Sequence, residues 1–286
     1  MNRPYPLYLV LTVAMALGAA GCSKGGNASS DASPSADATA VATALASPSP
    51  SSSSVASPAA GVTTSPAAFT DIAGVNGEKE IEELAVLGAV DPASGAFNPG
   101  APVKRREFIR WLVKANNALW SDAPTKFVHL ADKTEASSFP DVATTDPDFP
   151  FIQGMQNAGF SVGFPDKTFK PEQTLTREQM FAIKNIFDRG SVDPGLAKDL
   201  TFARNTVMPP WKDKESISKT YVAAIATGAG GGSDSFSRVY GVSAFFHPQL
   251  AVTRAQAAVA VSVVGDHIFS GGAQRTAAQP PATPTP

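Results

Sequence analysis

The chain has 286 residues, and its 23 lysines and arginines against 25 aspartates and glutamates give a net charge of −2 at pH 7. A near-neutral chain is a poor electrostatic match for nucleic acid, and a hydrophobic content of 43% argues against wholesale disorder. The single cysteine excludes an internal disulfide framework and a cysteine-based zinc cluster.

Residues 1–21 have the pattern of an export signal. One charged side chain, Arg3, precedes the apolar run 7–20, which is shorter than the roughly 20 residues needed to span a bilayer. Small residues then lead into Cys22, which resembles the bacterial lipobox. The resemblance implies a lipid on Cys22 that holds the protein to a membrane, either the periplasmic face of an outer membrane or the outer face of a cytoplasmic membrane. An ordinary secretory signal followed by a chance cysteine is the alternative.

The segment 22–67 is predicted to be a disordered tether behind the lipidated cysteine. It consists mostly of Ser, Ala, Thr and Pro and contains few charged side chains, so it cannot bury enough apolar surface to fold. A flexible chain of this length spans about 40 Å. The Pro-, Ala- and Thr-rich segment 271–286 is expected to be a second disordered tail.

Between these segments the same spacing occurs three times. A Phe-x-Pro motif lies eight residues before an arginine in the pairs Phe97 and Arg105, Phe169 and Arg177, and Phe246 and Arg254. Each arginine opens an apolar helical pattern, and each unit has an aspartate near its start: Asp71, Asp141 or Asp213. Earlier helices are predicted over 78–87, 149–158 and 216–227. In the third unit, Val259, Val263 and Ile268 are expected to share one face of the second helix.

These units resemble S-layer homology (SLH) modules. The resemblance implies a mainly α fold in which three tandem helix–loop–helix repeats, at 68–131, 132–200 and 201–270, surround a central three-helix bundle with pseudo-threefold symmetry. We call these ranges the first, second and third units. The resemblance also implies a cell-wall polysaccharide ligand that often bears pyruvate ketals. The ligand-binding positions that carry over are Arg105, Arg177 and Arg254, supported by Asp71, Asp141 and Asp213, with Arg177 as the best candidate.

The arginines fall where a helix begins, which is a poor place for a cation. Thr176 with Gln179 and Thr253 with Gln256 have capping-box spacing, and a positive side chain there opposes the helix dipole. A guanidinium beside the free N–H groups of a helix start can, however, bind a carboxylate or phosphate. Pairing with a nearby aspartate is the structural alternative. The aspartates could equally form turns, and the three tryptophans are more often buried than stacked on sugars.

No catalytic residues, metal site or cofactor are expected. The three histidines form no zinc motif, and the glycine-rich stretch 228–233 lacks the spacing of a phosphate loop. The sequence therefore predicts a non-catalytic envelope protein. It would bind cell-wall polysaccharide or peptidoglycan-linked glycan, attach to a membrane through lipid, and have no nucleic-acid partner. A protein-interaction scaffold and a wall-active glycan hydrolase are the alternatives.

Overall fold

The computed structural model describes residues 69–90, 95–160, 163–229, 235–265, 267 and 273–278. All of them belong to one compact unit, residues 60–286. The signal 1–21, Cys22 and the tether to residue 67 lie outside the described residues.

The described fold is mainly helical. In chain order the helices are α1 (Glu78–Val86), α2 (Arg105–Leu119), η1 (Pro124–Lys126), α3 (Phe149–Asn157), α4 (Arg177–Arg189), α5 (Pro194–Lys198), α6 (Leu200–Phe202), η2 (Ala203–Val207), η3 (Lys214–Ser216), α7 (Lys219–Ala229), α8 (Ser235–Tyr240) and α9 (Arg254–Val261). The strands β1 (Val263–Gly265) and β2 (Gln274–Thr276) pair antiparallel. The predicted start of each long helix at its arginine is confirmed.

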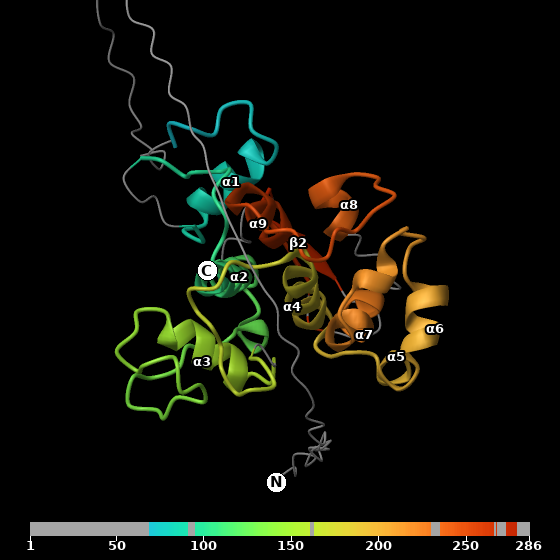
Figure 1. The fold of residues 1–286 in the computed structure, drawn as a ribbon. Coiled ribbons are helices and arrows are strands. Elements are labelled where there is room, and N and C mark those ends of the chain that lie inside the picture. Colours follow the sequence, from blue (N-terminus) through green and yellow to red (C-terminus); the bar gives the residue numbers. More distant parts are fainter. Residues whose placement is uncertain are drawn as a thin grey trace, which may run out of the picture. The chain divides into compact units, whose positions relative to one another are not determined.

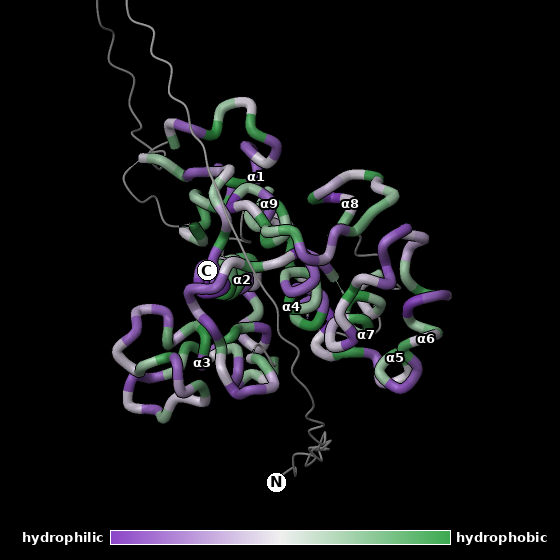
Figure 2. Tube along the Cα trace, in the orientation of Figure 1, coloured by the Kyte–Doolittle hydropathy of each residue, from purple (hydrophilic) through white to green (hydrophobic). Residues whose placement is uncertain are grey.

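Helices α2, α4 and α9 lie in the centre of the molecule, with the earlier helices outside them (Figure 1). Helix α9 contacts both α2 and α4. Each outer helix packs on a central helix of a different unit: α3 on α2, α7 on α4 and α1 on α9. Figure 2 shows hydrophobic residues along α2, α4 and α9 and several hydrophilic stretches in the loops around α3. The contact between α1 and α9 brings the first and third units together.

Three backbone hydrogen bonds form a closed ring where the segments before α2, α4 and α9 meet. The N–H of Val103 donates to the carbonyl of Val252 at 2.9 Å, Val252 donates to Leu175 at 2.9 Å, and Leu175 donates to Val103 at 3.0 Å. All three side chains are fully buried. Because each unit contributes one donor and one acceptor, the ring joins segments that are far apart in the sequence.

Ion pairs hold α3 against α2. Arg106 pairs with Asp146 and, at 3.4 Å, with Asp148, and Arg110 lies 2.6 Å from the same Asp148 carboxylate. Asp148 is almost fully buried. A buried carboxylate needs such partners, because a lone buried charge is very costly.

The third unit differs from its predicted course after α9. The helix ends at Val261, and Val263 belongs to strand β1 instead of the helix. The β-branched run around residues 261–264 favours an extended backbone. Ile268 lies outside the described residues.

The predicted disordered tail from residue 271 is wrong for residues 273–278, which include β2. Arg275 donates to the carbonyl of Leu119 at 2.7 Å and pairs with Asp122. Composition gave no sign of this segment's partners, because they lie more than 150 residues earlier in the chain.

We expect Leu175→Ala to lower the free energy of unfolding by about 2–5 kcal/mol, because it removes a fully buried side chain and leaves a cavity at the ring. Leu250→Ala is the matched control: Leu250 is 51% exposed, and its replacement should change stability by less than about 0.5 kcal/mol. Urea denaturation measures both. Equal effects of the two substitutions would contradict the central position of the ring.

Candidate functional site

Each predicted aspartate holds the Phe-x-Pro turn of its own unit. Asp71 accepts hydrogen bonds from the backbone N–H groups of Phe97 and Asn98, both at 2.7 Å. Asp141 does the same for Phe169 and Lys170, and Asp213 for Phe246 and His247. The residue before each proline has a positive φ of 54–58°, an uncommon conformation that the two hydrogen bonds help to hold. These contacts are those of turn-forming residues, one of the two roles that the sequence left open.

Each predicted arginine reaches the phenylalanine of another unit. Arg105 donates through Nε to the carbonyl of Phe169 at 2.9 Å, Arg177 through Nη1 to Phe246 at 3.1 Å, and Arg254 through Nε to Phe97 at 2.6 Å. The aspartate thus binds the N–H of a phenylalanine whose carbonyl accepts from the arginine. The arginines and aspartates meet through this shared residue.

Arg177 and Arg254 each contact a further side chain of the protein. The guanidinium carbon of Arg177 lies 3.7 Å from the ring centroid of Tyr240, and burial raises the pKa of this tyrosine to about 12. Arg254 forms an ion pair with Glu107 and lies 4.8 Å from the ring centroid of Trp111. Carboxylate pairing, the structural alternative for these arginines, thus occurs at Arg254 with Glu107 as the partner.

Arg105 differs because it lines a cavity of about 440 Å³. The side chain is only 3% exposed, and its guanidinium lies 4.4 Å from the ring centroid of Phe164. Burial lowers the pKa of Arg105 to about 10, while electrostatic interactions with Tyr221 and Asp141 oppose this shift. The side chain therefore remains a cation at neutral pH, buried at the wall of a cavity.

Helices α4 and α7 form most of the cavity wall, and its polar residues come from all three units. Arg105 of the first unit lies 3.5 Å from Gln179 of α4, measured from Nη1 to Oε1. Lys219, Thr220 and Tyr221 at the start of α7 complete the polar part. Burial raises the pKa of Tyr221, and the charge of Arg105 opposes this. A cation and several hydrogen-bond donors at one cavity can bind an anionic group.

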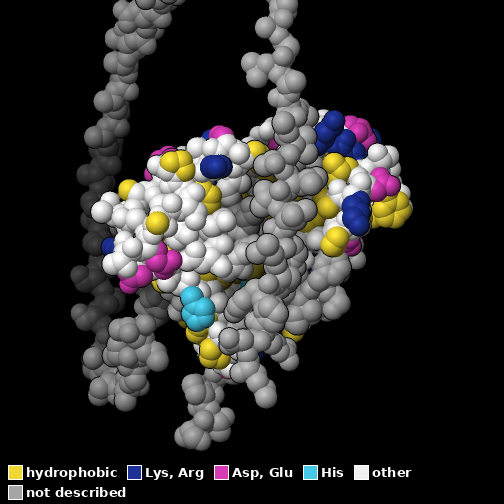
Figure 3. Space-filling view, turned by 90° about the horizontal axis from the view of Figure 1, so that it is seen from below, with side chains coloured by type: hydrophobic (Ala, Val, Ile, Leu, Met, Phe, Trp, Pro, Cys, Tyr) yellow, Lys and Arg dark blue, Asp and Glu magenta, His cyan; other side chains and the backbone are white. Residues whose placement is uncertain are grey.

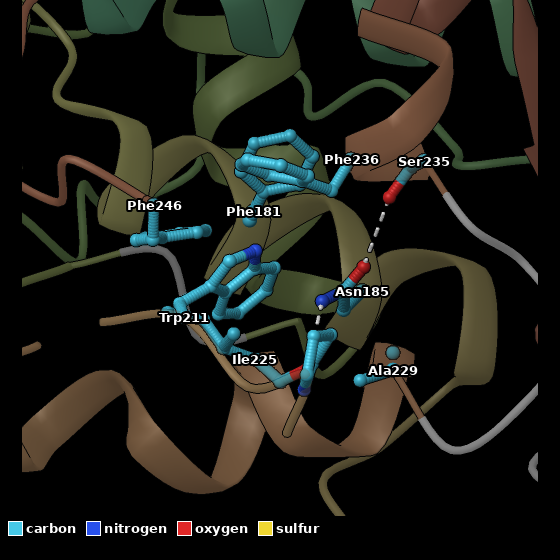
Figure 4. Close-up of a pocket in the computed structure, with 10 residues that line it drawn as sticks. Phe181, Asn185, Trp211, Ile225, Ala229, Ser235, Phe236 and Phe246 are labelled. Atoms are coloured by element: carbon cyan, nitrogen blue, oxygen red, sulfur yellow. Dashed lines mark hydrogen bonds between the residues drawn. The ribbon is translucent and has the colours of Figure 1, made fainter. Parts of the chain in front are cut away.

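A second, smaller cavity of about 130 Å³ lies between α4, α7 and α8 (Figure 4). Its wall includes four aromatic side chains, those of Phe181, Trp211, Phe236 and Phe246. The amide of Asn185 donates to the carbonyl of Ala224 at 3.3 Å and accepts from the hydroxyl of Ser235 at 3.4 Å. Since no charged side chain lines this cavity, it has little to offer an anion.

The tryptophans lie in the core. Trp111, Trp120 and Trp211 are 1%, 5% and 6% exposed, which leaves no open ring face on which a sugar could stack. On the face seen in Figure 3, basic and acidic side chains lie close together among hydrophobic ones. Anion binding on that face would therefore depend on individual side chains and not on a broad basic surface.

The sequence alone missed the cavity and four of its polar residues, Gln179, Lys219, Thr220 and Tyr221. The sequence indicates only a helix-capping role for Gln179. No local sequence pattern places the start of α7 near Arg105, which lies more than 100 residues earlier in the chain. Arg177, the best candidate from the sequence, is not among the residues that line the cavity.

Comparison with protein families finds a match to the S-layer homology domain over residues 138–181. The matched stretch contains Asp141, Phe169 and Arg177, the three recurring positions of the second unit. Domains of this family are non-catalytic modules that generally bind polymers of the cell wall or envelope. No curated protein matches the chain.

The described residues contain neither a membrane span nor a metal cluster. None of their helices combines the length and hydropathy needed to cross a bilayer. Likewise, no group of three or more metal-ligating side chains occurs in these parts of the chain.

Asp71→Asn tests the turn-holding role through pH. The backbone N–H of Phe97 is the main reason that the pKa of Asp71 lies below 3.8. The ionised carboxylate therefore stabilises the fold above that pH, and this stabilisation is lost as the pH falls through the lowered pKa. We expect wild type to be more stable than Asp71→Asn at neutral pH and the difference to shrink below pH 3.8, as measured by urea denaturation. A difference that is constant with pH would contradict this role.

Proposed function

We propose that this protein is a non-catalytic anchor of the cell envelope with three S-layer homology repeats in a pseudo-threefold arrangement. Its ligand would be an anionic, for example pyruvylated, cell-wall polysaccharide or a peptidoglycan-linked glycan. A lipid on Cys22 and the tether 22–67 would hold the repeats to a membrane. The lipid and tether rest on the sequence alone.

The three-repeat organisation is supported by contacts that recur in each unit. Only residues 138–181 match the family model, but the first and third units have the same aspartate-to-turn hydrogen bonds as the second. Their arginines also donate to the Phe-x-Pro phenylalanine carbonyl of another unit, as Arg177 of the second unit does. The closed ring of Val103, Leu175 and Val252 relates the three helix starts to one another.

The observation that carries the binding proposal is the buried cation of Arg105 at the wall of a cavity of about 440 Å³. The volume is within the range of about 300–1,000 Å³ typical of small-molecule sites. A glycan carboxylate that contacts Arg105 would gain charge-assisted hydrogen bonds in a place with little competing water. The geometry favours Arg105 over Arg177 and Arg254 because, of these three arginines, Arg105 alone lines this cavity.

Co-sedimentation with protein-free cell walls tests this function. The full chain with Cys22→Ser, which cannot be lipidated at that position, should pellet with the walls. Arg105→Gln should weaken binding at least about tenfold, because it removes hydrogen bonds from a charged donor. Arg177→Gln is the matched control, since it neutralises an equivalent arginine that does not line the cavity; it should leave binding nearly unchanged.

A second pair of variants, at exposed positions, keeps the binding test informative if Arg105→Gln fails to fold. Lys219 is an exposed residue at the cavity, so Lys219→Glu should weaken binding without affecting the core. Lys133→Glu makes the same charge change at an exposed residue that does not line the cavity. If wild type stays in the supernatant, wall binding is wrong and a protein partner becomes the leading explanation.

A further inference from the structure

The cavity beside Arg105 is polar at one end and apolar over the rest of its length. Along α4 its wall consists of Gln179, then Ala182 and Ile183, then Ile186. These positions follow the i, i+3, i+4, i+7 spacing of one helix face. Seven residues of helix cover about 10 Å. Only the first position is polar, and it is the one hydrogen-bonded to Arg105.

Helix α7 runs beside α4 in the same direction and repeats this polarity. The hydroxyl of Ser218, just before α7, donates to Glu178 at 2.7 Å, and about two turns further along both helices the carbonyl of Ala224 accepts from Asn185. The polar residues at the start of α7 therefore lie at the Arg105 end of the cavity. Ala223 and Ala224 lie beside the apolar part of α4.

The segment after α4 closes the apolar part of the cavity. Val192, Ala197 and Leu200 contribute to the wall there. Such an apolar surface offers no hydrogen bonds to sugar hydroxyls, which would lose their hydration without replacement. An aliphatic group would instead gain free energy by leaving water. The buried cation at the other end favours a carboxylate.

We propose that this cavity binds an amphipathic carboxylate, with its anionic group at Arg105 and an unbranched aliphatic chain along Ile183, Ile186 and Leu200. The inference rests on the proposed function in taking this cavity as the ligand site. The carboxylate could be a free fatty acid or an acyl substituent of the wall polymer that ends in a carboxylate. Both share the same chemistry.

Isothermal titration calorimetry with octanoate, hexanoate, butanoate and 1-octanol tests the proposal on the full chain with Cys22→Ser. Affinity should fall about fourfold for each methylene removed, or about sixteenfold from octanoate to hexanoate. The neutral octanol should bind at least about tenfold more weakly than octanoate. Equal affinities across the carboxylates, equal binding of octanol, or no binding of octanoate at millimolar concentration would each overturn the proposal.

Variants at the two ends of the cavity test the contacts of the ligand's anionic group and of its aliphatic chain separately. Arg105→Gln should weaken octanoate and butanoate alike, whereas Arg177→Gln should weaken neither. Val192→Asn places an amide in the apolar wall at a half-buried position, so it should weaken octanoate and spare butanoate. Because Val192 lies outside the ring and the central helices, this variant stays informative if Arg105→Gln fails to fold. Equal loss of both carboxylates in Val192→Asn would contradict the polarity of the cavity.

Cell walls before and after mild alkaline deacylation identify the source of the ligand. If the protein pellets less with deacylated walls, the ligand is an acyl substituent of the wall polymer. If pelleting is unchanged and octanoate still binds, the ligand is a free fatty acid. The two proposals can fail separately. Wall binding without octanoate binding would refute the amphipathic ligand alone, and octanoate binding without wall binding would refute the anchor alone.

Discussion

The closed ring of backbone hydrogen bonds among Val103, Leu175 and Val252 is the constraint on which the rest of the structure depends. It brings together three segments that are separated by more than 70 residues along the chain, so closing it carries a substantial entropic cost. The buried side chains around it and the exchange of helices between units offset that cost. Since α1 packs on α9, the third unit must be in place before the first is complete.

The ring also explains the position of the arginines. Two residues after each ring residue the chain begins a helix with Arg105, Arg177 or Arg254, and the ring fixes where that helix starts. Each arginine then meets the phenylalanine carbonyl of the neighbouring unit, whose turn is held by an aspartate. A cation is unfavourable at a helix start, and this hydrogen bond accounts for its presence there. The same arrangement leaves only Arg105 of the three at a cavity between α4 and α7.

Much of this organisation could be predicted from the sequence, because the recurring residues are local. The Phe-x-Pro spacing predicted the start of α2, α4 and α9, and the caps of Thr253 and Gln256 form as expected. What could not be predicted depends on pairs distant in the chain. Strand β2 exists because β1 and Asp122 meet it, and the cavity exists because α7 packs on α4. The surroundings of each arginine likewise depend on a residue distant in the chain: Tyr240 beside Arg177, Glu107 beside Arg254 and Tyr221 beside Arg105. No local sequence pattern relates the members of these pairs.

Native-state hydrogen exchange of the amides of Val103, Leu175 and Val252 tests most directly whether the ring makes the three units one cooperative structure. We predict that all three amides exchange only through global unfolding, with the same free energy of opening and the same dependence on denaturant. Leu175→Ala should lower protection at all three positions together. Faster exchange of Val252 alone, with Val103 and Leu175 still protected, would show that the third unit opens independently and would contradict the account.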